Sequence, residues 1–277
     1  HEKISEAVSY TQELITNGQS VIYEAAFSDG ETLCYMDILV RKDGQWRAYE
    51  VKASTGVKPY QVMDVAYQYY VITRSGLHLD DVYLVHINNQ YVRHGEIDVQ
   101  QLFTKACMTP TILPMQEQIR GNLTSIQKML AAGVVPDIEM GYQCTHPYNC
   151  DFMEFCRGCS QTEPEVTNQQ PASRNQAALD DFMDDLEYPL FFMDFETIFP
   201  AVPIHDESRP YQQIPFQFSL HVQKGENAPA EHYEFLGTPP VDPRPAFIEE
   251  LLARLGKHGS IIVWNQGFEM NRLREIA

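Results

Sequence analysis

Residues 34–54, CYMDILVRKDGQWRAYEVKAS, restrict the fold of this chain more than any other segment. Two runs rich in apolar residues flank Asp43-Gly44, a dipeptide typical of a two-residue type I′ hairpin turn. Such a turn fixes which residues of the two strands face each other, and it predicts that Asp37 lies directly opposite Glu50. The sequence therefore predicts a β-hairpin that carries two facing carboxylates.

This carboxylate pair has a lysine beside it. Directly opposed residues have Cβ atoms about 4.5–5.5 Å apart, which lets Asp37 and Glu50 hold one divalent ion, Mg²⁺ or Mn²⁺. Strand alternation puts Lys52 on the same face as Glu50, where an ammonium can orient or deprotonate a water or stabilise charge on a phosphorane. An exposed strand face with a cross-strand salt bridge is the alternative. Glu24 is a further candidate carboxylate, or a plain strand residue.

The hydrophobic periodicity predicts two α/β domains. In the first, helices are expected at 6–17 and 59–75, strands at 20–27, 32–41 and 45–54, a second hairpin at 81–88 and 90–97, and mainly helix at 99–132. The expected divisions are an α/β core at 1–108, a helical segment with cysteines at 109–160, a linker with a short acidic helix at 161–187, and a second α/β domain at 188–277.

The second domain carries another set of acids. Strands are expected at 189–198, 214–223, 231–236 and 260–264, with helices at 243–255 and from 266 onward. Alternation puts Asp194 and Glu196 on one face of the first strand and Phe195 on the other. Glu269 follows Asn265 at the start of the last helix, and we expect the three carboxylates to converge. Carboxylates arranged in this way are typical of two-metal hydrolysis of phosphodiesters.

Four of the six cysteines lie within sixteen residues, at Cys144, Cys150, Cys156 and Cys159. This clustering indicates a metal site more than a disulfide framework, and the spacing is too open for paired zinc knuckles. The two other cysteines, Cys34 and Cys107, are expected to be ordinary buried residues.

The net charge of −18 disfavours long-range attraction of a polyanion, so binding of nucleic acid needs a local basic patch or a metal. No apolar run is long enough for a membrane span, and a cytoplasmic protein is expected. The chain begins at His1 and stops inside an apparent helix, so both natural ends are expected to be missing.

Asp37, Glu50-Val51-Lys52 and a following helix with Gln68 in DVAYQYYVI resemble the PD-(D/E)XK nucleases, in particular the RecB-like branch that includes CRISPR-associated relatives. The resemblance implies a restriction-endonuclease-like fold in which Gln68 helps to hold the substrate end or the metal shell. The tyrosines after Gln68 depart from the usual spacing. In this branch a [4Fe-4S] cluster is often held by one early and three late cysteines, which implies such a cluster at 144–159. The fourth ligand would then be Cys159 or a cysteine before His1.

The second domain is similar to the DnaQ-like exonucleases of the ribonuclease-H-like fold. Asp194 and Glu196 match their first motif, and Glu269 stands where that family has aspartate. The segments MDFETI, PYQQIPFQFSLH, DPR and NQGFE more specifically resemble a bacterial domain of unknown function, number 2779, which follows a RecB-like nuclease. The last DnaQ motif would lie beyond Ala277, so this domain is expected to be partial.

These resemblances imply a metal-dependent nuclease that acts on DNA more readily than on RNA, in DNA repair, processing or defence. Two alternatives stay open. The chain can be a nucleic-acid-binding scaffold that keeps nuclease folds without turnover, or an enzyme in which only the DnaQ-like half is active. Dependence of cleavage on a divalent metal separates the scaffold from the enzymes.

Overall fold

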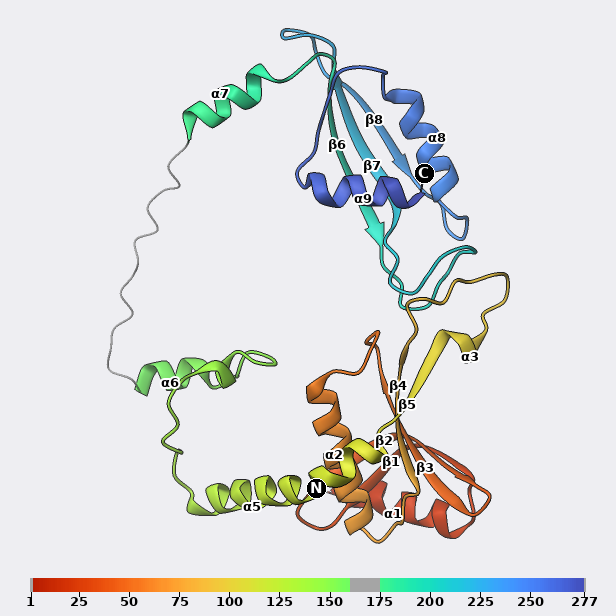
Figure 1. Ribbon diagram of the computed structural model, residues 1–277, viewed down its shortest axis with the longest axis vertical. Coiled ribbons are helices and arrows are strands. Elements are labelled where there is room, and N and C mark those ends of the chain that lie inside the picture. Colours follow the sequence, from red (N-terminus) through yellow and green to blue (C-terminus); the bar gives the residue numbers. More distant parts are fainter. Residues whose placement is uncertain (1, 160–174, 277) are drawn as a thin grey trace. The chain divides into compact units, whose positions relative to one another are not determined.

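The computed structural model describes residues 2–159 and 175–276 and divides the chain into two compact α/β units (Figure 1). The first unit is formed from residues 1–88 and 98–164, and the second from 89–97 and 165–277. Most of the predicted linker, residues 161–174, lies outside the described residues. Among the helices that are described, none is long and apolar enough to cross a membrane.

The first unit contains a five-stranded sheet. Its strands are β1 (Val21–Ser28), β2 (Leu33–Lys42), β3 (Gln45–Lys52), β4 (Asp81–Ile87) and β5 (Phe103–Cys107), in the order β1-β2-β3-β4-β5. Strands β3 and β4 are parallel and every other neighbouring pair is antiparallel. Helix α1 (Glu2–Thr16) precedes the sheet and packs on β1, and helix α2 (Pro59–Arg74) forms the crossover from β3 to β4.

The predicted hairpin register is confirmed. Lys42 pairs with Gln45, and the ladder continues as far as Ile38 opposite Tyr49. Asp37 and Glu50 follow directly after this last pair, at the end of the hairpin away from its turn. Register is well defined here because one face of the hairpin is buried, so a slip by one residue would expose that face.

Helix α2 covers the buried face of the sheet. Pro59 occupies its first turn, where the missing amide hydrogen costs nothing, and the Gln61 side chain accepts from the Lys58 amide to cap it. Its fully buried positions, Val65, Ala66, Val71 and Ile72, belong to one core with Leu39 of β2 and Leu84 of β4. Burial of this apolar stripe is what holds the helix against the strands.

The predicted second hairpin is wrong. Strand β4 pairs with β5, not with residues 90–97, and β5 interrupts the helical region expected at 99–132. Residues 89–97 belong to the second unit, where the Arg93 amide donates to the Ser208 carbonyl and the Arg93 carbonyl accepts from Glu207. The turn at Asn89 is present, but a local alternating pattern cannot say which backbone a segment will pair with.

Short elements complete the first unit. They are α3 (Val99–Leu102), α4 (Thr109–Ile112), the 3₁₀ turn η1 (Leu113–Met115), α5 (Gln116–Ala132), the 3₁₀ turn η2 (Tyr142–Cys144) and α6 (Met153–Cys159). Helix α5 packs on α2 and ends at Gly133, whose φ of 63° favours glycine.

The second unit contains a four-stranded sheet in the order β8-β7-β6-β9. Its elements are α7 (Gln176–Asp184), β6 (Leu190–Ile198), β7 (Ile214–Gln223), β8 (Glu231–Leu236), α8 (Arg244–Arg254), β9 (Ser260–Ile262) and α9 (Gln266–Ile276). Strand β9 is parallel to β6, and the other pairs are antiparallel. The type and order of the elements predicted from residue 189 onward are confirmed.

An aromatic cluster forms the core of this unit. The Phe247 ring of α8 lies 5.7 Å from that of Phe195 on β6 and 5.4 Å from that of Phe218 on β7, both edge to face. The Phe268 ring of α9 lies 5.9 Å from that of Phe195. Helices α8 and α9 therefore both contribute to the face of β6 that carries Phe195.

Candidate functional site

Glu50 is the most buried charged residue of the first sheet, with only 6% of its surface exposed. It lies on the same strand face as the core residues Trp46 and Ala48, so a carboxylate stands where the pattern of β3 would otherwise place an apolar side chain. Its Oε1 accepts a hydrogen bond of 2.7 Å from Lys52, while its buried Oε2 has no hydrogen-bond partner within the described structure. An unpartnered buried carboxylate oxygen is costly unless a cation or donor arrives.

Lys52 joins the strand to helix α2. Its Nζ donates to Glu50 Oε1 and to Asp64 Oδ2, each at 2.7 Å. Burial alone would lower the pKa of Lys52, but its bonds to Asp64 and Glu50 outweigh that effect and raise the pKa above its ordinary value. Lys52 is therefore held as a cation, and among its expected roles this favours charge stabilisation over proton abstraction.

Asp37 lies beside this cluster. Its Oδ2 accepts a hydrogen bond of 2.6 Å from the Val51 amide, which ties it to β3 between Glu50 and Lys52. Burial raises the pKa of Glu50, and the neighbouring Asp37 charge raises it further against the opposing effect of Lys52. The two carboxylates are thus close enough to interact electrostatically, in agreement with the hairpin register.

Glu24 is exposed and stands across from Asp37, between the pairs Tyr23–Ile38 and Ala25–Met36. Its φ of 50° is unusual for glutamate and interrupts the strand alternation at this point. Glu24 is thus a strand residue that lies close in register to Asp37 and Glu50.

Gln68 of α2 is buried, with 6% of its surface exposed, and its Oε1 has no hydrogen-bond partner among the described residues. The Gln68 side chain helps to lower the pKa of Glu50. This residue of α2, a candidate from the sequence, therefore lies close to Glu50 on β3. Cys34 is also buried beside these acids. Burial, reinforced by Glu50 and Asp64, raises the pKa of its thiol to about 12, which makes it inert.

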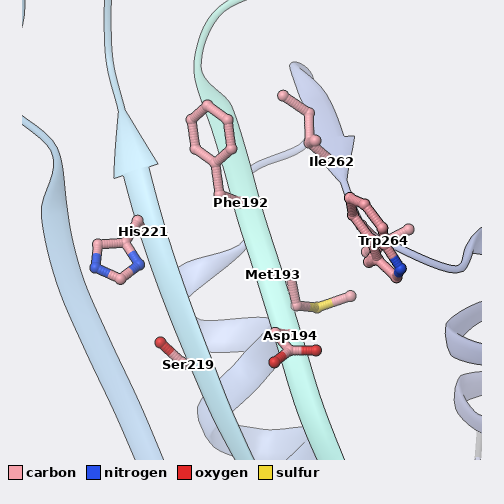
Figure 2. A pocket seen from close by; sticks show the side chains of 8 residues that line it. Phe192, Met193, Asp194, Ser219, His221, Ile262 and Trp264 are labelled. Atoms are coloured by element: carbon pink, nitrogen blue, oxygen red, sulfur yellow. The ribbon is translucent and has the colours of Figure 1, made fainter. Parts of the chain in front are cut away.

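In the second unit, Asp194 and Glu196 are exposed and Phe195 is buried, as alternation along β6 predicts. Asp194 lines a pocket of about 530 Å³ on the exposed face of this sheet. Figure 2 shows Phe192 and Asp194 of β6 beside Ser219 and His221 of β7, with Trp264 beyond β9.

Glu269 lies in the first turn of α9 and is buried, with 5% of its surface exposed. The helix begins after Asn265, whose side chain accepts from the Phe268 amide, in agreement with the predicted helix start. The Oε2 of Glu269 is buried without a hydrogen-bond partner in the described part of the chain. Glu269 therefore differs from the exposed pair Asp194 and Glu196, and the structure does not bring the three together as ligands of one ion.

Three cysteines line one cavity. Cys144, Cys150 and Cys156 border an apolar space of about 610 Å³ with residues of α5 and α6, and the Cys150 amide donates to the Cys144 carbonyl at 2.8 Å. The side chain of Cys159 lies outside the described residues. The expectation that Cys107 is buried is wrong. It ends the edge strand β5 and is exposed.

Across residues 2–159 and 175–276, no three Asp, Glu, His or Cys side chains are placed so that they could hold one metal ion. What the first unit offers is a pair of acids with a lysine and a glutamine. Sequence reasoning missed Asp64, although it lies one helical turn before Gln68 and so shares its face of α2. It also missed Ser219 and His221, which only the pairing of β7 with β6 places near Asp194.

The chain is thus an α/β protein in which each of two sheets carries acidic residues. Residues 191–277 match the family described as Domain of unknown function (DUF2779). The match covers β6 to α9, including Asp194, Glu196 and Glu269, and supports the resemblance that these segments show. A comparison with curated proteins gave no match.

Proposed function

We propose that this chain is a metal-dependent nuclease that acts in the cytoplasm on nucleic acid, with DNA as the preferred substrate, and that its site is Asp37, Glu50, Lys52 and Gln68. The observation that carries the proposal is Glu50. A buried carboxylate with one oxygen on a lysine and the other without a partner, next to a second carboxylate, is suited to a divalent cation.

The donor set fits Mg²⁺ or Mn²⁺, since both favour carboxylate oxygen. Asp37 and Glu50 would hold the ion, and it would supply an activated water and polarise a phosphoryl oxygen. Lys52 would stabilise negative charge that develops on the phosphate, and Gln68, whose buried amide oxygen has no hydrogen-bond partner among the described residues, would hold the substrate end. The order of α1, three antiparallel strands, α2 and a parallel strand supports a PD-(D/E)XK, RecB-like fold.

The second unit supports a DnaQ-like, ribonuclease-H-like assignment through its strand order and through Asp194, Glu196 and Glu269. We assign the cleavage to the first unit, because Glu50 there is buried beside Lys52 and Asp37, whereas Asp194 and Glu196 are exposed. The decisive experiment presents labelled single- and double-stranded DNA and RNA with Mg²⁺, Mn²⁺ or EDTA. Cleavage that needs the metal and is lost in Glu50→Ala supports the proposal. Binding without cleavage would favour a scaffold.

We further propose that Cys144, Cys150 and Cys156 are ligands of a [4Fe-4S] cluster, because three thiols on one apolar cavity suit a soft-ligand metal centre. Cys159, or a cysteine outside this sequence, would be the fourth ligand. Anaerobic reconstitution should give iron, sulfide and a broad absorption near ~400 nm. Serine at all three positions should abolish the bound iron, the bound sulfide and the absorption, while Cys107→Ser, the exposed control, should not. Stoichiometric zinc would overturn this assignment.

A further inference from the structure

We propose that Asp64 is the positioning residue for Lys52, and that it keeps the ammonium in place when a cation occupies Glu50. This inference rests on the proposed nuclease function. Lys52 Nζ has two carboxylate partners at the same distance of 2.7 Å, Glu50 Oε1 on its own strand and Asp64 Oδ2 on α2. Of these two partners, only Asp64 is not a proposed metal ligand.

The argument follows from competition for Glu50. A divalent ion on this carboxylate withdraws electron density from its oxygens and repels the nearby ammonium, so the bond between Lys52 and Glu50 weakens when the ion binds. Lys52 is 25% exposed and has a long flexible stem, so it would swing toward solvent without a second anchor. Asp64 supplies that anchor from the helix.

The position of Asp64 is fixed by the start of the helix. Gln61, one turn earlier on α2 and only 3% exposed, donates to Ser54 Oγ at 3.1 Å and accepts from the Lys58 amide at 2.9 Å. These bonds join α2 to the chain immediately after Lys52. Asp64 itself is 39% exposed, so its side chain contributes through the bond to Lys52 more than through packing.

The test compares Asp64→Asn with Asp43→Asn, which removes one negative charge at the exposed hairpin turn, where asparagine also tolerates the positive φ. Asp64→Asn should lower kcat about tenfold to a hundredfold with little change in KM, because it misplaces a group that acts in the transition state. Asp64→Glu should recover part of the loss. Asp43→Asn should match the unmodified chain.

A second readout does not depend on activity. The lysines are acetylated with an amine-reactive ester, and Lys52 is quantified by mass spectrometry against the other lysines. In the unmodified chain Lys52 should be protected in EDTA and in Mg²⁺. In Asp64→Asn it should stay protected in EDTA, because Glu50 still binds it, and become about tenfold more reactive in Mg²⁺.

The outcomes separate the two proposals. If no nucleic acid is cut but Lys52 follows this labelling pattern, the nuclease proposal fails and the role of Asp64 stands. If the chain cuts and Asp64→Asn behaves as Asp43→Asn in kcat and in labelling, the role of Asp64 is overturned. Protection of Lys52 in Asp64→Asn with Mg²⁺, or its exposure in the unmodified chain with Mg²⁺, overturns it as well.

Discussion

Among the described residues, each unit buries one glutamate that has an unpartnered oxygen, yet the surroundings of the two glutamates differ. Glu50 is 6% exposed and lies in a sheet with Lys52 on one oxygen and Asp37 nearby. Glu269 is 5% exposed and lies in the first turn of α9, where the helix dipole favours a negative charge. Burial alone therefore does not identify a catalytic acid. The neighbouring cation and second carboxylate make Glu50 the stronger candidate.

The other acids sharpen the contrast. Asp194 and Glu196 are exposed on a sheet face, where solvent screens them and no lysine or arginine is bonded to them within the described residues. Preorganised charge in a poorly solvated site is worth far more in catalysis than the same charge in water. The comparison favours the first unit as the location of the proposed chemistry.

The largest expected effect comes from Lys52→Ala. It should lower Mg²⁺-dependent cleavage by about 10²–10⁴-fold, because it removes the charge proposed to stabilise the reacting phosphate. The measurement is single-turnover cleavage of a labelled DNA. Asp194→Asn is the comparison variant and should change the rate by less than about threefold, since its carboxylate is outside the proposed site. A loss in Asp194→Asn as large as that in Lys52→Ala would transfer the activity to the second unit.

The sequence could predict the register that brings Asp37 and Glu50 together because this geometry is local. A two-residue turn at Asp43 and Gly44 sets the register, and the distance along the chain from Asp37 to Glu50 is short. Asp64 was missed because its partner lies across the crossover to α2, and no spacing rule links a helix position to a strand lysine.

The errors elsewhere in the fold have the same origin. Strand β4 pairs with β5, and residues 89–97 belong to the second unit, where Arg93 bonds to the backbone of Glu207 and Ser208. Cys107 is exposed because β5 is an edge strand, a fact of sheet order rather than of composition. Alternation and helix starts were predictable, while non-local pairing was not.

Phe247→Ala tests whether the units work separately. Phe247 is fully buried and contacts Phe195, Phe218 and Phe235, so truncation should lower the free energy of unfolding of the second unit by about 3–5 kcal/mol. Phe192→Ala, on the exposed face, should cost less than about 1 kcal/mol. Denaturant titration measures both. Cleavage by Phe247→Ala should persist at every denaturant concentration at which the first unit stays folded. Loss of cleavage under those conditions would contradict the assignment of cleavage to the first unit.

Glu50→Gln should stabilise the protein at pH 7 in EDTA by about 1 kcal/mol, while it abolishes cleavage, because it removes a buried charge from the proposed site. Burial raises the pKa of Glu50, so the folded state holds this proton more tightly than the unfolded state. Stability of the unmodified chain therefore falls as the pH rises from the ordinary value of 4.5 through the raised pKa. The difference in unfolding free energy between Glu50→Gln and the unmodified chain should disappear below that pH window. Denaturant titrations from pH ~4 to ~8 measure this difference. A difference that does not depend on pH would contradict destabilisation by the charge on Glu50.

The smallest expected effect is that of Glu269→Gln. Two contributions oppose each other here: relief of a buried charge stabilises the amide, while loss of the interaction with the start of α9 destabilises it by about 0.3–1 kcal/mol. The net change in unfolding free energy at pH 7 should stay within about 0.5 kcal/mol, and cleavage should be unchanged. Denaturant titration of Glu269→Gln and Glu50→Gln side by side makes the comparison direct.

Stabilisation equal to that of Glu50→Gln would show that the charge on Glu269 is equally destabilising and would remove the distinction between the two buried glutamates. A loss above about 2 kcal/mol would instead show that its carboxylate has a bonded partner in solution.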